Sequence, residues 1–304
     1  TAGLGELRSW FCQRAVYSPR QLFEIMSQFW ENHFVTQQSK SSDYIQGLGF
    51  DSTPAGVIAA DWEYREVAKW RNAMLNPNCT FYDLLKISAE SPAMIVYLDT
   101  VNSKGSGNNI ANENYARELL ELFTFGVDNG YEQEDIVRMS RAWTGWSVQL
   151  VDEVNADNPF APASLTYYPN TNSSSTANKV GVLAFNYIAG NHGTNRGALF
   201  AGKTVPARFG APWTTKIYSS NAPAGSYQLT IPSRLTSNTN SIQDGYDVIY
   251  HLANLPFTEE YICVKLCRLF VHDGFPNPTT HADLPEYYFY DYTDPNRSAE
   301  AELV

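Results

Sequence analysis

Residues 158–243 contain no aspartate and no glutamate, and this gap most constrains how the 304-residue chain can fold. The stretch is rich in Asn, Ser, Thr, Pro and Gly, with β-prone runs at Val180–Tyr187 and Ser226–Ile231. This composition predicts irregular structure or β-hairpins. Six basic residues give the stretch a formal charge of +6, so the rest of the chain carries −17 within the total of −11. We therefore expect a basic flap (residues 158–243) that docks on the acidic body of its own chain or of a neighbour.

Both sides of the flap carry the start signals of helices. Ser18-Pro19, Thr53-Pro54 and Ser91-Pro92 each combine an N-cap with a proline suited to the first helical turn, and Thr80 and Thr258 are further caps. Apolar stripes at helical spacing follow several of these caps. We predict a mainly α fold, a multi-helix globular body with a long irregular or β-hairpin insertion. The expected segments are a helical body (1–147), the insertion (148–243), and C-terminal helices of the same body with an acidic, aromatic tail (244–304).

Composition excludes several classes of protein. An aromatic content of 14% with only 17% charged residues argues against intrinsic disorder, and the acidic net charge argues against a nucleic-acid partner. No run of about 18 apolar residues occurs, so we expect no membrane span. Uncharged polar residues and Tyr replace charged residues on the expected surface, which favours an extracellular, cell-surface or periplasmic location. The Thr-Ala-Gly start fits a processed or trimmed piece of a longer exported protein.

The four cysteines do not define a disulfide framework in a chain of this length. Cys263 and Cys267 lie one turn apart in an expected helix, where Cβ atoms are about 5–6 Å apart. That is too far for a disulfide between them. Each could pair with Cys12 or Cys79, or all four could be buried thiols.

The segment from Asn112 to Gly126 is the most informative candidate for chemistry. It predicts a helix with one apolar arc and an opposite arc in which Arg117 lies four residues from both Glu113 and Glu121. One interpretation is a solvated face whose ion pairs contribute about 0.2–0.5 kcal/mol each. In the other, the arginine holds one carboxylate as a poised acid or base. Phe125 falls within the polar arc, which indicates that this face is covered.

Two histidines are further candidates. His33 continues an apolar stripe and should point inward, as a hydrogen-bonded core residue or as a proton carrier. His192 lies in Gly190-Asn-His-Gly-Thr, where we expect an exposed loop that can carry function. No two histidines lie within four residues of each other, which excludes a helical His pair for a metal and leaves open single ligands that the fold brings together. Phosphate-loop, dinucleotide, zinc-protease and serine-hydrolase motifs are absent, and we expect no metal or cofactor. The aromatic run Trp143-Thr-Gly-Trp146 is core or a sugar platform.

Several motifs together resemble the bacterial family named domain of unknown function eighteen-hundred. They span about residues 20–275 and are Phe29–Phe34, Ser91–Asp99, Asn112–Gly126, Arg141–Trp146 and Tyr261–Val271. The resemblance implies an exported, largely helical bacterial protein without an established reaction. The family pattern has a His-Asp pair, whereas His192 is followed here by Gly193, and residues 204–241 form an enlarged insertion relative to the family.

Two functions are consistent with these features. The first is an exported, hydrolase-like enzyme acting on an extracellular polymer, with Glu113 or Glu121 as acid or base, Arg117 as the positioning cation and His33 as proton carrier. The second is a non-catalytic cell-surface or extracellular assembly subunit, in which residues 158–243 contact a protein partner or a second copy of the chain.

Overall fold

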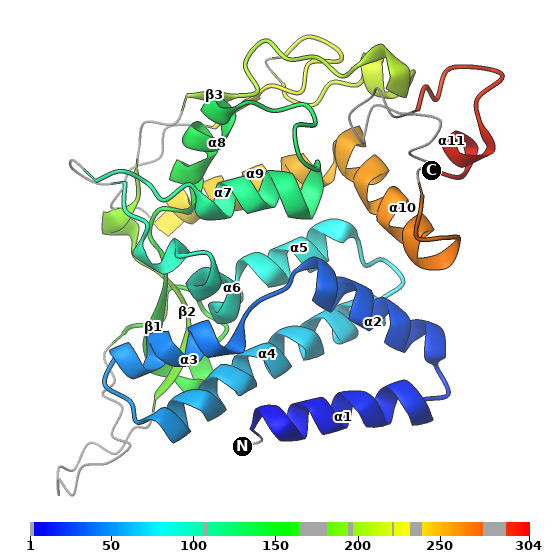
Figure 1. The fold of residues 1–304 in the computed structure, drawn as a ribbon. Coiled ribbons are helices and arrows are strands. Elements are labelled where there is room, and N and C mark those ends of the chain that lie inside the picture. Colours follow the sequence, from blue (N-terminus) through cyan, green and yellow to red (C-terminus); the bar gives the residue numbers. More distant parts are fainter. Residues whose placement is uncertain are drawn as a thin grey trace, which may run out of the picture. The chain divides into compact units, whose positions relative to one another are not determined.

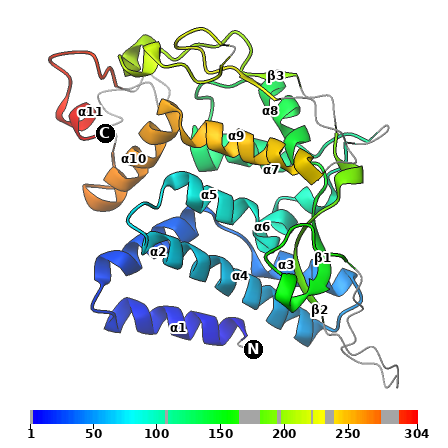
Figure 2. The same ribbon diagram turned by 180° about the vertical axis from the view of Figure 1, so that it is seen from behind.

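The computed structural model describes residues 3–105, 109–163, 181–193, 197–220, 222–231, 239–275 and 290–304. The fold is mainly α, as predicted, with two small antiparallel sheets (Figures 1 and 2). The α-helices are α1 (Leu4–Tyr17), α2 (Gln21–His33), α3 (Gln38–Gly47), α4 (Ser52–Met74), α5 (Phe81–Ala89), α6 (Pro92–Tyr97), α7 (Asn114–Glu118), α8 (Gln133–Ser140), α9 (Gln243–Ala253), α10 (Pro256–Phe270) and α11 (Ala299–Leu303). The strands are β1 (Trp146–Asp152), β2 (Gly181–Tyr187), β3 (Ala198–Leu199) and β4 (Leu229–Thr230).

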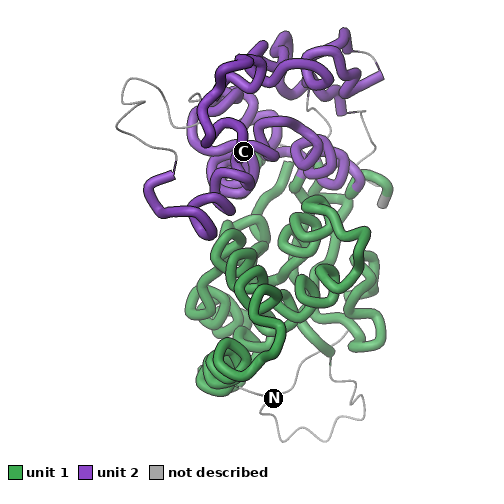
Figure 3. Tube along the Cα trace, turned by 90° about the vertical axis from the view of Figure 1, so that its right-hand side faces the viewer, with its two compact units in different colours: residues 1–112, 143–192, 236–242 green, residues 113–142, 193–235, 243–304 purple. Residues whose placement is uncertain are grey.

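The chain divides into two compact units, coloured separately in Figure 3. Unit 1 consists of residues 1–112, 143–192 and 236–242, and unit 2 consists of residues 113–142, 193–235 and 243–304. Each unit therefore combines segments that lie far apart in the sequence. The division at residues 147 and 243, expected from composition, stays a prediction.

Unit 1 is organised around α4, its longest helix, which contacts α1, α2, α3, α5 and α6. β1 and β2 form an antiparallel pair in register from Trp146↔Tyr187 to Asp152↔Gly181, and β1 contacts α6. β2 confirms the strand predicted within the flap from the β-prone run Val180–Tyr187. β2 also contacts α6, and the Trp62 indole of α4 donates to the carbonyl of Leu183 in β2.

Local capping explains where several helices begin. Thr80 accepts the backbone N–H of Asp83 and the Asp83 carboxylate accepts that of Thr80, while Pro92 is the first residue of α6 with Ser91 as N-cap; both starts were predicted. The expected cap at Thr258 is wrong. Pro256 begins α10 with Leu255 as N-cap, and the Thr258 hydroxyl donates to the carbonyl of Leu252.

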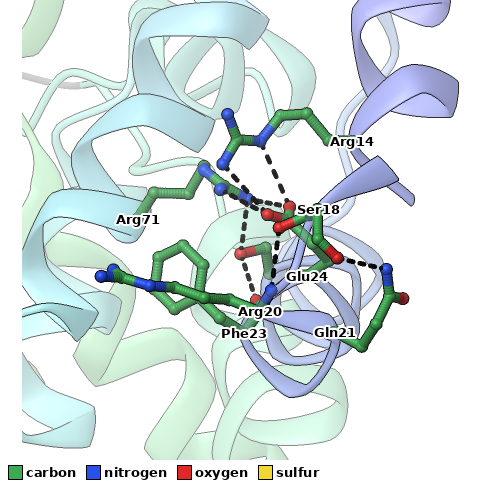
Figure 4. A network of polar contacts seen from close by, with 8 residues as sticks. Arg14, Ser18, Arg20, Gln21, Phe23, Glu24 and Arg71 are labelled. Carbon is green, nitrogen blue, oxygen red and sulfur yellow. Dashed lines mark hydrogen bonds and ion pairs between the residues drawn. The ribbon is translucent and has the colours of Figure 1, made fainter. Parts of the chain in front are cut away.

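A polar network joins α1, α2 and α4 (Figure 4). The buried Arg71 guanidinium holds the Glu24 carboxylate through two hydrogen bonds of 2.6 and 3.0 Å, and Arg14 approaches the same carboxylate to 3.0 Å. Arg71 also donates to Ser27 Oγ and lies 4.6 Å from the Phe23 ring centroid. The hydrogen bond from Arg71 is the largest cause of the low pKa of Glu24, about 2. Two cations around one buried carboxylate tie the three helices together.

The run Trp143-Thr-Gly-Trp146 belongs to the core of unit 1. Both tryptophans are almost fully buried, which confirms the core interpretation over a sugar platform. Gly145 has φ +89°, and a Cβ there would lie 2.6 Å from the carbonyl oxygen of Ile188. Its own carbonyl accepts the N–H of Ile188 and so extends the β1–β2 ladder past Trp146. Only glycine fits this turn without displacing the paired segment.

In unit 2 the described part of the basic flap docks on helices of the same chain. Lys203 Nζ lies 2.9 Å from Glu132 Oε1, beside α8. The Arg208 guanidinium binds both oxygens of Glu260, a buried residue of α10. Docking of the flap on the acidic body of its own chain is therefore confirmed at Lys203 and Arg208. The basic residues Lys179, Arg196 and Arg234 lie outside the described residues.

Two further findings concern the cysteines and membrane spans. Cys12, Cys79, Cys263 and Cys267 are all free thiols. Cys12 is exposed, Cys79 and Cys263 are partly exposed and Cys267 is buried, so the expectation of buried thiols is confirmed only at Cys267. Within the described part of the chain, no helix has both the length and the apolar character that a bilayer crossing requires.

Candidate functional site

The predicted Glu113–Arg117–Glu121 ladder forms in unit 2. The Arg117 guanidinium lies 3.5 Å from Glu113 Oε2 and 3.3 Å from Glu121 Oε1. Gln133 of α8 closes the network, since it accepts from Arg117 and donates to Glu113, both at 2.8 Å. The three charged side chains are 37%, 35% and 25% exposed, so water screens the pairs strongly and each contributes little to stability.

A π-helical turn at Leu119–Thr124 explains why Phe125 is buried. The N–H of Phe125 donates to the carbonyl of Leu120, five residues back, which places Phe125 on the apolar side of the helix. There it stacks on Phe257 of α10 with 4.8 Å between ring centroids. A regular helix would have put Phe125 among the charges. Its burial therefore comes from the wider turn and is no sign that the polar face is covered.

His33 lies in the aromatic core of unit 1, inward as predicted. Its ring packs at 4.6 Å from Phe34, 5.7 Å from Trp30 and 6.0 Å from Phe81, and the residue is almost fully buried. His33 and His192 belong to unit 1 and the ladder residues to unit 2. The five residues predicted from the sequence therefore do not form one site within either unit.

His192 is fully buried, so the expectation of an exposed loop histidine is wrong. Its Nδ1 lies 2.7 Å from the carbonyl oxygen of Thr144 and 3.2 Å from the Thr144 hydroxyl. The ring thus fastens the loop after β2 to the turn that precedes β1. Its partner is 48 residues away in the sequence, a contact that local pattern does not predict.

A cavity of about 540 Å³ lies within unit 1, in the size range of small-molecule sites. One face of α4 lines it from Val57 to Asn72, together with the end of α5, the start of α6 and residues 181–185 of β2. Glu153, Ala156, Asp157 and Pro159 complete the lining. Its apolar lining includes Phe50, Val57, Ile58 and Ile87. The charged groups around it include the pairs Asp61–Arg65 at 2.6 Å and Lys69–Asp157 at 2.9 Å, which neutralise each other.

Glu66 is the buried acid of this cavity, only 4% exposed. Ser91, which also lines the cavity, donates its hydroxyl to Glu66 Oε2 at 2.6 Å. Burial raises the pKa of Glu66 well above its usual value, and the nearby Glu63 and Glu31 carboxylates raise it further, against the lowering effect of the Ser91 and Ser88 hydroxyls. Glu66 is therefore protonated more readily than an ordinary glutamate.

Glu31 and Glu63 extend this acidic cluster from Glu66 toward the end of α2. Burial raises the pKa of both, and Glu63 adds to the rise at Glu31. The Thr36 hydroxyl donates to Glu63 Oε2 at 2.5 Å. Neighbouring acids that cannot all ionise share protons, so Glu31 and Glu63 can hold Glu66 in its acid form. Among the described residues, no group of three or more acidic, histidine or cysteine side chains is arranged to hold a metal ion.

Sequence reasoning missed Glu66, although the pattern contains a signal for it. Trp62, Glu66 and Trp70 are spaced by four along α4, and both tryptophans belong to the apolar stripe of that helix. A carboxylate on an apolar stripe points inward, where burial raises its pKa. Such a group in a cleft is typical of a functional site.

Comparison with known proteins gives a family and no function. The model of a family described as a protein of unknown function, DUF1800, matches residues 2–294. Neither the curated proteins nor the solved structures contain a match.

Proposed function

The chain belongs to the DUF1800 family, and from this premise we propose that it is an exported, hydrolase-like enzyme with its acid–base site in the cavity of unit 1. Its substrate is an extracellular polymer, in keeping with the low charge content of the chain. The proposed catalytic acid is Glu66. This proposal moves the site away from the Glu113–Arg117–Glu121 ladder, whose exposed charges give weaker support for a poised acid.

The observation that carries the proposal is the burial of Glu66 beside a cavity of ligand size. A carboxylic acid kept neutral by an apolar environment can protonate a leaving group near neutral pH, where an ordinary carboxyl group has no proton to give. The hydrogen bond from Ser91 fixes the orientation of the carboxyl group.

Hydrolysis at this site needs no reactant other than water. Glu66 gives its proton to the leaving group as the bond to the polymer breaks. Water adds its hydroxide to the other fragment, and the proton released from water returns to the Glu66 carboxylate, which restores the acid. Glu63 and Glu31 act on this cycle through the charge they place near Glu66.

A substrate screen with matched variants tests the proposal. Purified protein is assayed against polysaccharide, ester and peptide substrates, and any activity found is compared in Glu66→Gln and in Glu134→Gln, an exposed residue of α8. Loss of a general acid should lower kcat by about 10²–10⁴-fold. Glu134→Gln should leave activity unchanged. Wild-type activity should also fall as pH rises through the pKa of Glu66, because the deprotonated group cannot act as acid.

Two results would contradict the proposal. Full activity in folded Glu66→Gln with loss in Glu121→Gln would return the site to the ladder. Absence of hydrolysis in every screen, combined with a stable oligomer in solution, would favour the assembly-subunit hypothesis.

A further inference from the structure

We propose that the cavity of unit 1 binds an extended peptide segment with uncharged, apolar side chains, which adds as a strand to the edge of β2 that faces away from β1. The inference rests on the proposed function, because it assigns the polymer substrate to the polypeptide class. It depends on three features of unit 1: the direction in which β2 faces the cavity, its hydrogen-bond register, and the chemistry of the remaining lining.

The cavity runs along the edge of β2. Five consecutive residues, 181–185, line it. Successive side chains of a strand point to opposite faces of the sheet, so a cavity over one face would meet only alternate residues. Contact with five in a row therefore places the backbone edge of β2 against the cavity.

The register identifies which amides point to that edge. Ile188 N–H donates to Gly145 O, so the even-numbered residues of β2 pair with β1. Tyr187 N–H instead donates outward to Pro159 O, at 2.7 Å. Alternation then directs the N–H groups of Phe185 and Leu183 outward as well, and neither has a partner among the described residues. Phe185 is a buried residue, and a buried amide without a partner is costly.

The chain already occupies part of this edge, in one case with a backbone carbonyl. Pro159 occupies it at Tyr187 and itself lines the cavity, and Trp62 Nε1 donates to Leu183 O at 3.1 Å. Between these contacts, the backbone N–H groups of Leu183 and Phe185 are donors spaced two residues apart. A peptide in extended conformation has carbonyl groups at the same repeat, whereas sugar hydroxyls do not.

The dimensions and lining of the cavity fit such a peptide. The lining face of α4 extends from Val57 to Asn72, about 22 Å at 1.5 Å per residue, which is the length of about six or seven residues of strand. Phe50, Ile58 and Ile87 offer an apolar surface to its side chains. The ion pairs Asp61–Arg65, Lys69–Asp157 and Lys86–Glu90 neutralise most of the charged groups around the cavity, and Glu153 adds one carboxylate at its border, so the lining has no cation left over to select an acidic side chain.

Peptide binding is measured on the complete chain by fluorescence anisotropy. The probe is an acetylated, amidated and fluorescein-labelled hexapeptide of alternating valine and serine. Two analogues, N-methylated on the valines or on the serines, each remove one alternating set of backbone donors and crowd the adjacent carbonyls. We expect the parent peptide to bind and at least one analogue to bind tenfold or more weakly. Equal binding of all three peptides, or no binding of the parent, would overturn the proposal.

A pair of variants at one position isolates the edge donor. Leu183→Pro removes the outward N–H and keeps the ladder to β1, since proline is tolerated where the N–H faces away from the sheet. Leu183→Ala removes the side chain and keeps the N–H. We expect Leu183→Pro to bind the peptide about three- to tenfold more weakly than Leu183→Ala, the effect of one hydrogen bond. Equal affinity of the two variants would contradict strand addition.

Hydrogen exchange gives a readout that does not depend on any variant folding. In the wild-type chain the amides of Leu183 and Phe185 should exchange faster than those of Val182 and Ala184, and the peptide should slow them. Slow exchange at all four amides in the free protein would show that the edge is already occupied and would refute the proposal.

Failure of this inference can be told apart from failure of the proposed function. If the peptide still binds to Glu66→Gln and the wild type hydrolyses nothing, the peptide site is supported and the proposed enzymatic function is contradicted. If maltohexaose binds and the peptide does not, and Glu66→Gln loses polysaccharide hydrolysis, the proposed enzymatic function is supported and the peptide site is contradicted.

Discussion

Replacing Glu24 by Gln should lower the free energy of unfolding by about 3 kcal/mol at neutral pH. The variant leaves Arg71, a buried cation, without its anion, and breaking such a pair costs about 3–5 kcal/mol. The pKa of Glu24 gives an independent value. A fall from 4.5 to about 2 on folding corresponds to about 3 kcal/mol of stabilisation of the ionised carboxylate.

The pKa of Glu24 also predicts how the stability difference between wild type and Glu24→Gln depends on pH. Because the pKa of Glu24 is lower in the folded state, its stabilisation is fully present above about pH 4.5 and is lost as pH falls toward 2. The gap between wild type and Glu24→Gln should therefore be constant near neutral pH. By pH 3 about 2 kcal/mol of it should have disappeared.

Urea unfolding, followed by circular dichroism from pH 7 to pH 3, measures this gap. Asp157→Asn is the control, because Asp157 is 86% exposed and its pair with Lys69 should contribute less than about 1 kcal/mol. A second variant, Glu24→Gln with Arg71→Met, removes both buried charges and should recover part of the loss. A cost below about 1 kcal/mol for Glu24→Gln at pH 7, or a gap that does not change with pH, would refute the reasoning.

Three further predictions concern other buried features. Gly145→Ala should cost more than about 1 kcal/mol in urea unfolding, because an L-residue is strained at φ +89° and its Cβ meets Ile188 O; an unchanged midpoint would contradict this. Arg208→Met should cost about 3–5 kcal/mol in urea unfolding, since it leaves the buried Glu260 carboxylate without a cation. A neutral effect would argue against the pair. Burial lowers the pKa of His251 from 6.5 to about 4. The free energy of unfolding should therefore fall by up to about 3 kcal/mol as pH drops from 6.5 to 4. An NMR titration that gives His251 a pKa near 6.5 would refute this prediction.

Two of the helix starts predicted from local caps are confirmed. The caps expected at Ser18 and Thr53 are wrong, because α2 begins after Arg20 and α4 begins after Asp51. Thr80 and Ser91-Pro92 satisfy the first backbone N–H groups of their own helices or supply a proline that needs none. α1 could not be predicted from periodicity, because none of its residues is buried. It is attached to unit 1 by contacts of individual side chains, such as Arg14 with Glu24, and these leave no apolar stripe in the sequence.

The candidate site was harder to predict, for two physical reasons. A helical wheel assumes 100° per residue, and the π-helical turn at Leu119–Thr124 breaks that assumption, so Phe125 was assigned to the wrong face. The environments of His192 and Glu66 depend on partners distant in the sequence, Thr144 for the first and Ser91 for the second. The ladder around Arg117 was predicted correctly because its charges are close in the sequence: Glu113 directly precedes α7, Arg117 lies in α7, and Glu121 lies near the start of the π-helical turn.

The uneven charge of the chain has a structural use inside unit 2. The pair between Lys203 and the exposed Glu132 is open to water, so salt should weaken it. Arg208 and Glu260 are both nearly inaccessible, so counter-ions cannot reach them and their pair should resist salt. Tyr292 also donates to Glu260 and joins the C-terminal segment to the same buried carboxylate. One acid of α10 thus fastens both the flap and the C-terminal segment, and raised salt should loosen the flap first near Lys203 and last near Arg208.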